Sequence, residues 1–151
     1  MNKRTIEKEL ELNGRCVIQT VGVSMEPLLH NRKSTVVIEK AEFPLKKYDV
    51  VLFRRPTEEY VLHRVVKTAG DVYIIQGDNC IGKETVPKEQ IIGVMTGYYE
   101  DENDDYISCA SRHYRRYLRK LKIRNTASGL RRLFKSVCRK LFMSLKNRAW
   151  L

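Results

Sequence analysis

The sequence predicts a mainly β fold, a small barrel or folded sheet, with a short helix before it and a basic helical tail after it. Short runs rich in Val, Ile and Tyr, turn-forming residues between those runs, and a helical spacing of apolar residues in the last third support this prediction. The chain has 151 residues, a length that suits one domain with a sizeable hydrophobic core.

Six runs have the composition of β-strands. Turn-forming sequences such as Arg55-Pro56, Gly70-Asp71 and Gly77-Asp78-Asn79 separate several of them. The expected strands span 16–21, 34–39, 49–54, 60–66, 71–76 and 91–99. Six short strands at this spacing favour a mostly antiparallel sheet that folds over or closes into a barrel.

Helices are expected at both ends of the chain. The first spans 4–14 (RTIEKELELNG) and is closed by its last two residues, Asn13 and Gly14. In the tail, apolar residues recur at steps of three and four, with a break at 125–129. The stripe before the break is Tyr114, Tyr117, Leu118 and Leu121; the stripe after it is Leu130, Leu133, Phe134, Val137, Leu141, Phe142 and Leu145.

The charges divide the chain into three parts. Residues 1–100 carry 15 Lys and Arg against 14 Asp and Glu, 101–107 carry four acids, and 108–151 carry 14 bases and no acid. The expected organisation is therefore a near-neutral domain over 1–100, an acidic connector over 101–107 and a basic amphipathic tail over 108–151. The tail and the domain are expected to have different functions.

Composition also argues against several classes of protein. No apolar run approaches the roughly 18 residues of a membrane-spanning helix, and acidic residues interrupt the first eleven, so we expect neither an integral span nor a secretory signal. The expected location is cytoplasmic or peripheral to a membrane. The four cysteines, Cys16, Cys80, Cys109 and Cys138, lack the paired spacing of a zinc site, so reduced thiols and no bound metal are expected.

Ser24 and His63 are the candidate catalytic pair. Ser24 follows an expected strand and precedes Pro27, so its hydroxyl is expected at the edge of the sheet rather than within a ladder. A serine hydroxyl needs a base within hydrogen-bond reach. Imidazole titrates near neutrality, so a neutral His63 can accept the hydroxyl proton at physiological pH.

A carboxylate is needed to orient the imidazole, and backbone amides to stabilise an oxyanion. Asp78 and Glu84 are the candidate orienters, because both follow the next strand after His63. Amides of the Ser24 turn, including that of Ser24, are the candidate oxyanion donors. Taken singly, each residue also has an ordinary structural explanation, and Gly-Asp-Asn is a common turn sequence.

Together and in this order, these segments resemble the S24/S26 serine peptidases, which include signal peptidases and LexA-type self-cleaving repressors. The resemblance covers roughly 15–97 and is carried by GxSMxPLL at 22–29, LHRV at 62–65, GDN at 77–79 and IIGV at 91–94. Most of the family has a lysine as the base. The endoplasmic-reticulum and archaeal signal peptidases instead have a histidine followed by Arg, and His63-Arg64 resembles this second branch. This resemblance implies Ser24 as nucleophile and His63 as general base.

The sequence departs from the family pattern at two places. Gly22 stands where many signal peptidases carry a small hydroxyl residue, so an oxyanion would depend on backbone amides. The family commonly continues GDNN with an acidic cluster, whereas this chain reads GDNCIGKETV. The motif favours Asp78 as the orienter, with Glu84 as the alternative.

The expected function is that of a serine endopeptidase of signal-peptidase type, without a cofactor, cleaving leader or precursor peptides with small residues near the scissile bond. Met25 and Pro27 are the expected substrate-binding residues. The alternatives are a LexA-like self-cleaving or DNA-associated regulator and a non-catalytic peptide-binding domain. For the tail, an anionic membrane surface is the favoured partner over a solvated face folded back on the protein, and nucleic acid is the least favoured.

Overall fold

The computed structural model describes residues 5–101 and 105–126 and has a mainly β fold, as the sequence predicts. Eight strands in this part of the chain form one antiparallel sheet that does not close into a barrel. The elements are α1 (Ile6–Asn13), β1 (Arg15–Gln19), β2 (Thr35–Lys40), β3 (Val50–Arg54), β4 (Tyr60–Ala69), β5 (Val72–Gln76), β6 (Glu84–Pro87), the 3₁₀-helix η1 (Lys88–Gln90), β7 (Ile91–Tyr99) and β8 (Ile107–Ser108).

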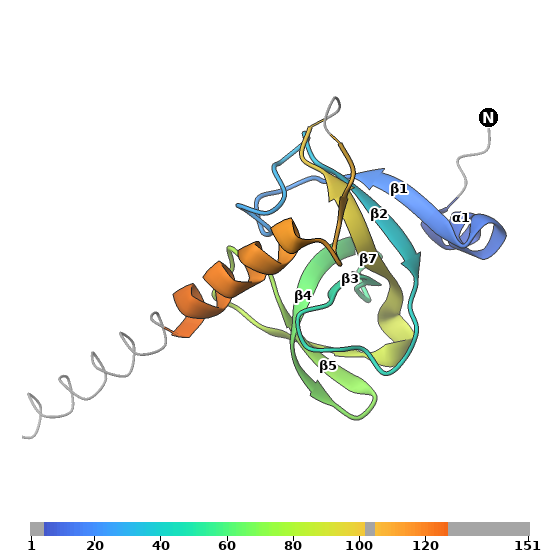
Figure 1. Cartoon of the computed structure of the whole chain (residues 1–151). Helices are drawn as coiled ribbons and strands as arrows, with labels where there is room; N and C mark the ends of the chain where they lie inside the picture. The colour runs from blue at the N-terminus through green and yellow to red at the C-terminus, as the bar shows by residue number, and fades with distance from the viewer. Residues whose placement is uncertain (1–4, 102–104, 127–151) are drawn as a thin grey trace, which may run out of the picture. The chain divides into compact units, whose positions relative to one another are not determined.

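The order of strands in the sheet is β1-β2-β7-β3-β4-β5-β6, and β8 adds to β7. The sheet is strongly curled (Figure 1), so residues of β1 and β4 line the same groove although they are far apart in this order. Register shifts occur in β2–β7, β3–β7 and β4–β5, and such bulges increase the local bend of a sheet.

Two terminal residues explain the length of α1. The Thr5 side chain accepts a 3.4 Å hydrogen bond from the Lys8 amide at the start, and Gly14 adopts a left-handed conformation with φ 70° at the end. The Gly14 amide donates to the Leu10 carbonyl at 2.9 Å, which completes the last turn. The expected helix over 4–14 is therefore present in its central part.

The hydrophobic core lies inside the curl of the sheet. One cluster joins residues from β3, β4, β5, β6 and β7, all with at most 8% of their surface exposed: Leu45, Val51, Phe53, Val65, Tyr73, Ile75, Val86 and Ile91. His63 pairs with Val51 in register and is two residues from Val65, so it belongs to the same core-facing row. The core therefore fixes the ring of His63.

The six expected strands are all present, with differences at their ends. The strand expected over 60–66 extends to Ala69, and a bulge between Val65 and Lys67 allows the longer pairing with β5. Two strands were not expected: β6, which pairs with β5, and the two-residue β8, which pairs with β7 beside the acidic connector.

The chain divides into two compact units, Met1–Arg115 and Arg116–Leu151, so the division lies beyond the expected boundaries at 100 and 107. Residues 112–126 are helical, which agrees with the first half of the expected tail. The second apolar stripe, over 130–145, lies outside the described residues. Within the described part of the chain, no helix has the length and apolar character needed to cross a membrane.

Candidate active site

Ser24 lies in a compact series of turns between β1 and β2. The Glu26 amide donates to the Val23 carbonyl at 3.2 Å, and the amides of Leu28 and Leu29 donate to the Met25 carbonyl at 3.0 and 3.1 Å. Leu28 and Leu29 are buried, whereas Ser24 is half-exposed. The apolar side chains therefore anchor the turns and leave the serine accessible.

The Gly77-Asp78-Asn79 segment holds this serine turn directly. The Asn79 amide donates to the Ser24 carbonyl at 2.8 Å, and the Asn79 side-chain amide donates to the Val23 carbonyl at 3.2 Å. Two motifs that are more than fifty residues apart are thus joined by hydrogen bonds. Asn79 therefore positions the backbone of the Ser24 turn.

Gly77 marks the place where the serine turn and the imidazole meet. A Cβ atom at Gly77 would lie 2.7 Å from the Ser24 carbonyl oxygen and 3.1 Å from His63 Nε2. Both atoms therefore lie close to the same point, so the serine turn and the imidazole approach each other at Gly77. The structure thus brings the backbone of Ser24 and the ring of His63 together at Gly77.

Glu84 is the carboxylate at the other ring nitrogen of His63. Its Oε1 lies 3.2 Å from Nδ1, although the geometry is not that of a well-directed hydrogen bond. Arg55 holds Glu84 through two hydrogen bonds of 2.8 Å. Arg55 is a site residue that the sequence alone does not single out, because its only signal is its place at the end of a strand before Pro56.

The surroundings of His63 favour a neutral imidazole. Burial lowers the pKa of His63 below its usual value of 6.5, and the positive charge of Arg55 lowers it further, while Glu84 and Asp78 act in the opposite direction. Hydrogen bonding to Arg55 lowers the pKa of Glu84, which is therefore ionised near neutral pH. A proton on Nδ1 facing Glu84 leaves the lone pair of Nε2 directed toward the groove.

Asp78 has a different partner, and this corrects the preference for Asp78 as the orienter. Its two carboxylate oxygens accept hydrogen bonds of 2.7 and 2.6 Å from Arg64 Nε and Nη2. Both side chains are almost fully buried. The arginine that the motif places after the histidine thus secures the Gly77-Asp78-Asn79 segment, and Glu84 is the carboxylate in contact with the imidazole.

A groove of about 550 Å³ runs past the candidate pair. Its lining includes Ser24, His63 and Arg55, and many of the other side chains are apolar: Ile6, Ile18, Val21, Met25, Leu29, Leu52, Val61 and Leu62. The structure thus places Met25 at the groove as expected, but Pro27 is exposed and is not among the lining residues. The expectation that Pro27 contacts substrate therefore stays a prediction.

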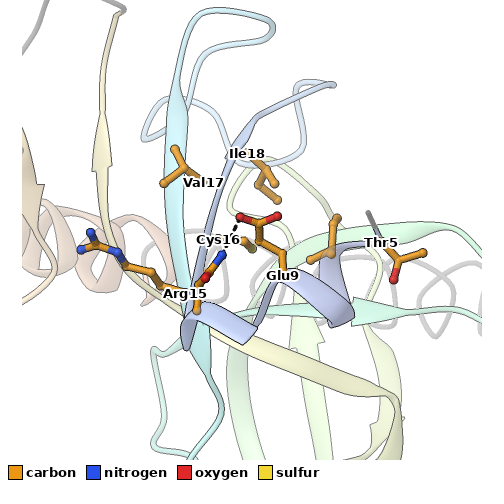
Figure 2. A pocket seen from close by; sticks show the side chains of 8 residues that line it. Thr5, Glu9, Arg15, Cys16, Val17 and Ile18 are labelled. Carbon is orange, nitrogen blue, oxygen red and sulfur yellow. Dashed lines mark hydrogen bonds between the residues drawn. The ribbon is translucent and has the colours of Figure 1, made fainter. Parts of the chain in front are cut away.

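A second hollow lies between α1 and β1 and offers a useful comparison (Figure 2). Eight residues line it, including Glu9 and Cys16, but none of them is a serine or a histidine. Burial raises the pKa of Cys16, and the charge of Glu9 raises it further, so this thiol stays protonated. This hollow has no nucleophile with an adjacent base, unlike the groove beside Ser24.

The groove therefore combines a half-exposed serine, a neutral imidazole and an ionised carboxylate behind the imidazole. These are the groups that acyl transfer through a serine requires. Comparison with protein-family models and with curated proteins finds no family and no sequence that matches the chain. The assignment of a function therefore depends on the residues and geometry of the groove.

Proposed function

We propose that the chain is a serine endopeptidase that acts on peptides, as its resemblance to signal peptidases implies. The observation that carries this proposal is the meeting of the Ser24 turn and His63 Nε2 at Gly77, with Glu84 at the opposite ring nitrogen. Structural turns and core histidines do not require this combination. An apolar groove beside the pair supports a peptide substrate rather than a small polar one.

In the proposed reaction, the Ser24 hydroxyl attacks the carbonyl carbon of the scissile bond while His63 Nε2 accepts the hydroxyl proton. The tetrahedral intermediate breaks its C–N bond, and the imidazolium gives its proton to the leaving amine. Water then attacks the acyl-enzyme with His63 again as base, which releases the acid and restores Ser24. Glu84 stabilises the imidazolium in both steps.

The groove fits an extended peptide with small or apolar side chains near the scissile bond. Met25 is 4% exposed and lines the groove together with Ser24, so we expect the groove to accept only a small side chain there. Arg55 also lines this groove, but its guanidinium already donates two hydrogen bonds to Glu84. Shallow apolar walls of this kind select against charged residues beside the cleaved bond.

The test is hydrolysis of a mixture of unstructured peptides with small residues, analysed by mass spectrometry. Ser24→Ala and His63→Ala are each expected to lower kcat/KM by at least about 10³-fold, because either change removes the nucleophile–base pair. His30→Ala is the matched control, because His30 is exposed and outside the groove. Retained hydrolysis by Ser24→Ala protein would refute the assignment, and the intact mass of protein incubated alone reports self-cleavage.

We propose a separate role for the helix over 112–126, namely binding to an anionic membrane surface. All seven bases of this segment are exposed, and it has no acidic residue. Each base near an anionic surface contributes about 1 kcal/mol. In vesicle co-sedimentation, replacing Arg116, Arg119 and Lys120 with Gln is expected to weaken binding to anionic vesicles, whereas binding to zwitterionic vesicles stays low for both proteins. Equal binding to both vesicle types would contradict this role.

A further inference from the structure

The turn after β5 places a thiol in the groove. Cys80 is one of the groove's lining residues, and its Sγ atom lies 2.8 Å from the point where a Cβ atom of Gly77 would stand. His63 Nε2 lies 3.1 Å from the same point, and the Ser24 carbonyl oxygen 2.7 Å from it. The thiol, the base and the serine turn therefore surround one small volume.

Hydrogen bonds fix the backbone that presents this thiol. The Cys80 amide donates to the Gly77 carbonyl at 3.0 Å, which closes a tight turn over 77–80. The side-chain amide of Gln76 donates to the Cys80 carbonyl at 2.6 Å. Because both ends of the residue are held, the position of the thiol beside His63 follows from the turn and not from a freely moving loop.

Cys16 and Cys109 lie in different surroundings. Burial raises the pKa of Cys16, and it raises the pKa of Cys109 to about 11. Both thiols are thus kept protonated, and Cys16 is only 4% exposed. Cys80 is half-buried on an open groove, and the ring nitrogen near it is Nε2 of His63, a side chain that is 9% exposed.

We propose that Cys80 is a thiol modification site whose occupation by a small disulfide closes the groove beside Ser24. This inference rests on the proposed function, because the adduct would regulate that same site. The chemical class of the modifier is a small disulfide, for which oxidised glutathione is a suitable probe.

The modification is a thiol–disulfide exchange in which His63 acts as base. Nε2 accepts the Cys80 proton, and the thiolate attacks one sulfur of the reagent. A bond forms between Cys80 Sγ and that sulfur, the reagent's S–S bond breaks, and the second sulfur leaves with the electron pair and takes the proton from the imidazolium. Cys80 is oxidised and the released thiol is the reduced product, so no further oxidant is needed.

The adduct would obstruct catalysis because of where Sγ lies. A Cβ atom added at Gly77 would lie 2.8 Å from Cys80 Sγ and 2.7 Å from the Ser24 carbonyl oxygen, so there is no free space on that side of the thiol. A group attached to Sγ must therefore extend into the groove that Ser24 and His63 share. Reduction by dithiothreitol removes the group and restores the site.

The experiment treats the full chain with oxidised glutathione, and follows both the intact mass with peptide mapping and the hydrolysis of peptides. Cys80 is expected to be modified faster than Cys16 and Cys109, and kcat/KM is expected to fall by about tenfold or more, because the occupied groove no longer positions the peptide. Dithiothreitol is expected to reverse both changes. Each variant is compared with its own untreated rate, and Cys80→Ala protein is expected to retain that rate after treatment, whereas Cys16→Ala protein loses activity.

Two further variants separate this inference from the proposed function. Ser24→Ala protein is expected to be modified at Cys80 as fast as the unchanged chain, and His63→Ala protein on the order of tenfold more slowly, because the thiol has lost its base. Modification of Cys80 no faster than of Cys16 and Cys109, or modification without loss of hydrolysis, would overturn the inference. A chain that is modified at Cys80 but hydrolyses no peptide before treatment would contradict the proposed function alone.

Discussion

Arg64 holds both carboxylate oxygens of Asp78, at 2.7 and 2.6 Å, with 1% of the arginine side chain and 3% of the aspartate side chain exposed. Arg64 also donates to the Tyr48 carbonyl and to the Tyr114 hydroxyl, each at 2.8 Å. Because Asn79 follows Asp78 and donates to the Ser24 carbonyl, this buried pair fixes the segment that positions the Ser24 turn. The pair next to His63 is therefore structural.

Asp78→Asn is expected to destabilise the protein. The change leaves the Arg64 charge buried without its counter-ion, and removing one partner of such a pair costs about 3–5 kcal/mol. The measurement is the midpoint of urea unfolding at pH 7. Asp71→Asn is the control, because Asp71 is 81% exposed and lies 3.8 Å from Lys88, so the midpoint should hardly move. An Asp78→Asn protein of unchanged stability with lost hydrolysis would instead give Asp78 a direct role in catalysis.

Glu84→Gln is expected to have the opposite profile, with low activity and a retained fold. Removing the charge at Nδ1 takes away the stabilisation of the imidazolium, and such a loss costs on the order of 10²- to 10⁴-fold in kcat. Glu59→Gln is the matched control, because Glu59 also contacts Arg55, at 3.1 Å, but is exposed and does not touch the imidazole. Equal kcat for the two variants would exclude Glu84 as the orienter.

The pH dependence of hydrolysis should follow His63. Because burial lowers its pKa, the neutral base persists below pH 6.5, and kcat/KM should begin to fall only as the pH drops through the lowered value. Arg55→Gln removes a positive charge that lowers this pKa, so the acidic limb should move to higher pH. Glu84→Gln removes a charge that raises it, so the limb should move to lower pH. Shifts in the same direction for both variants would contradict the assignment of the base.

Most of the fold could be predicted from the sequence, because the strands are short apolar runs with turns between them. Strand β6 was not predicted, because that pattern is weak there. In β6 (Glu84–Pro87) only Val86 is buried, so the four residues lack the repeated apolar alternation that marks a strand. The pairing of β6 with β5 supplies the missing stabilisation, and this long-range contact has no signal in the local sequence.

The candidate site was less fully predictable, for a related reason. Ser24 and His63 could be found because their motifs are local, but the choice between Asp78 and Glu84 depends on which side of the sheet each reaches. Glu84 pairs with Ile75, which pairs with Val65, so it shares the core-facing row of His63. Asp78 lies beyond the end of β5, where Arg64 is already within reach. Spacing in the sequence cannot show this difference.

Gly77→Ala is expected to reduce activity more than any other single-carbon change near the groove. The backbone φ of Gly77 is not in the left-handed region, so the residue is required for space and not for conformation. The added Cβ would lie 2.7 Å from the Ser24 carbonyl oxygen, a backbone atom that Asn79 holds in place, and 3.1 Å from His63 Nε2. One of these groups must move.

A displacement of about 1 Å at the reacting groups costs on the order of 10²-fold in rate, and overpacking costs about 1–3 kcal/mol in stability. The expected result for Gly77→Ala is therefore a large loss of kcat with a folded protein, measured by peptide hydrolysis and by urea unfolding. Gly82→Ala is the matched control, because a Cβ at Gly82 meets no atom within 4 Å and the residue lies a few positions further along the same loop. If Gly77→Ala protein keeps the activity of Gly82→Ala protein, the Ser24 turn and His63 do not need this close approach, and the proposed pairing at Gly77 is not how catalysis occurs.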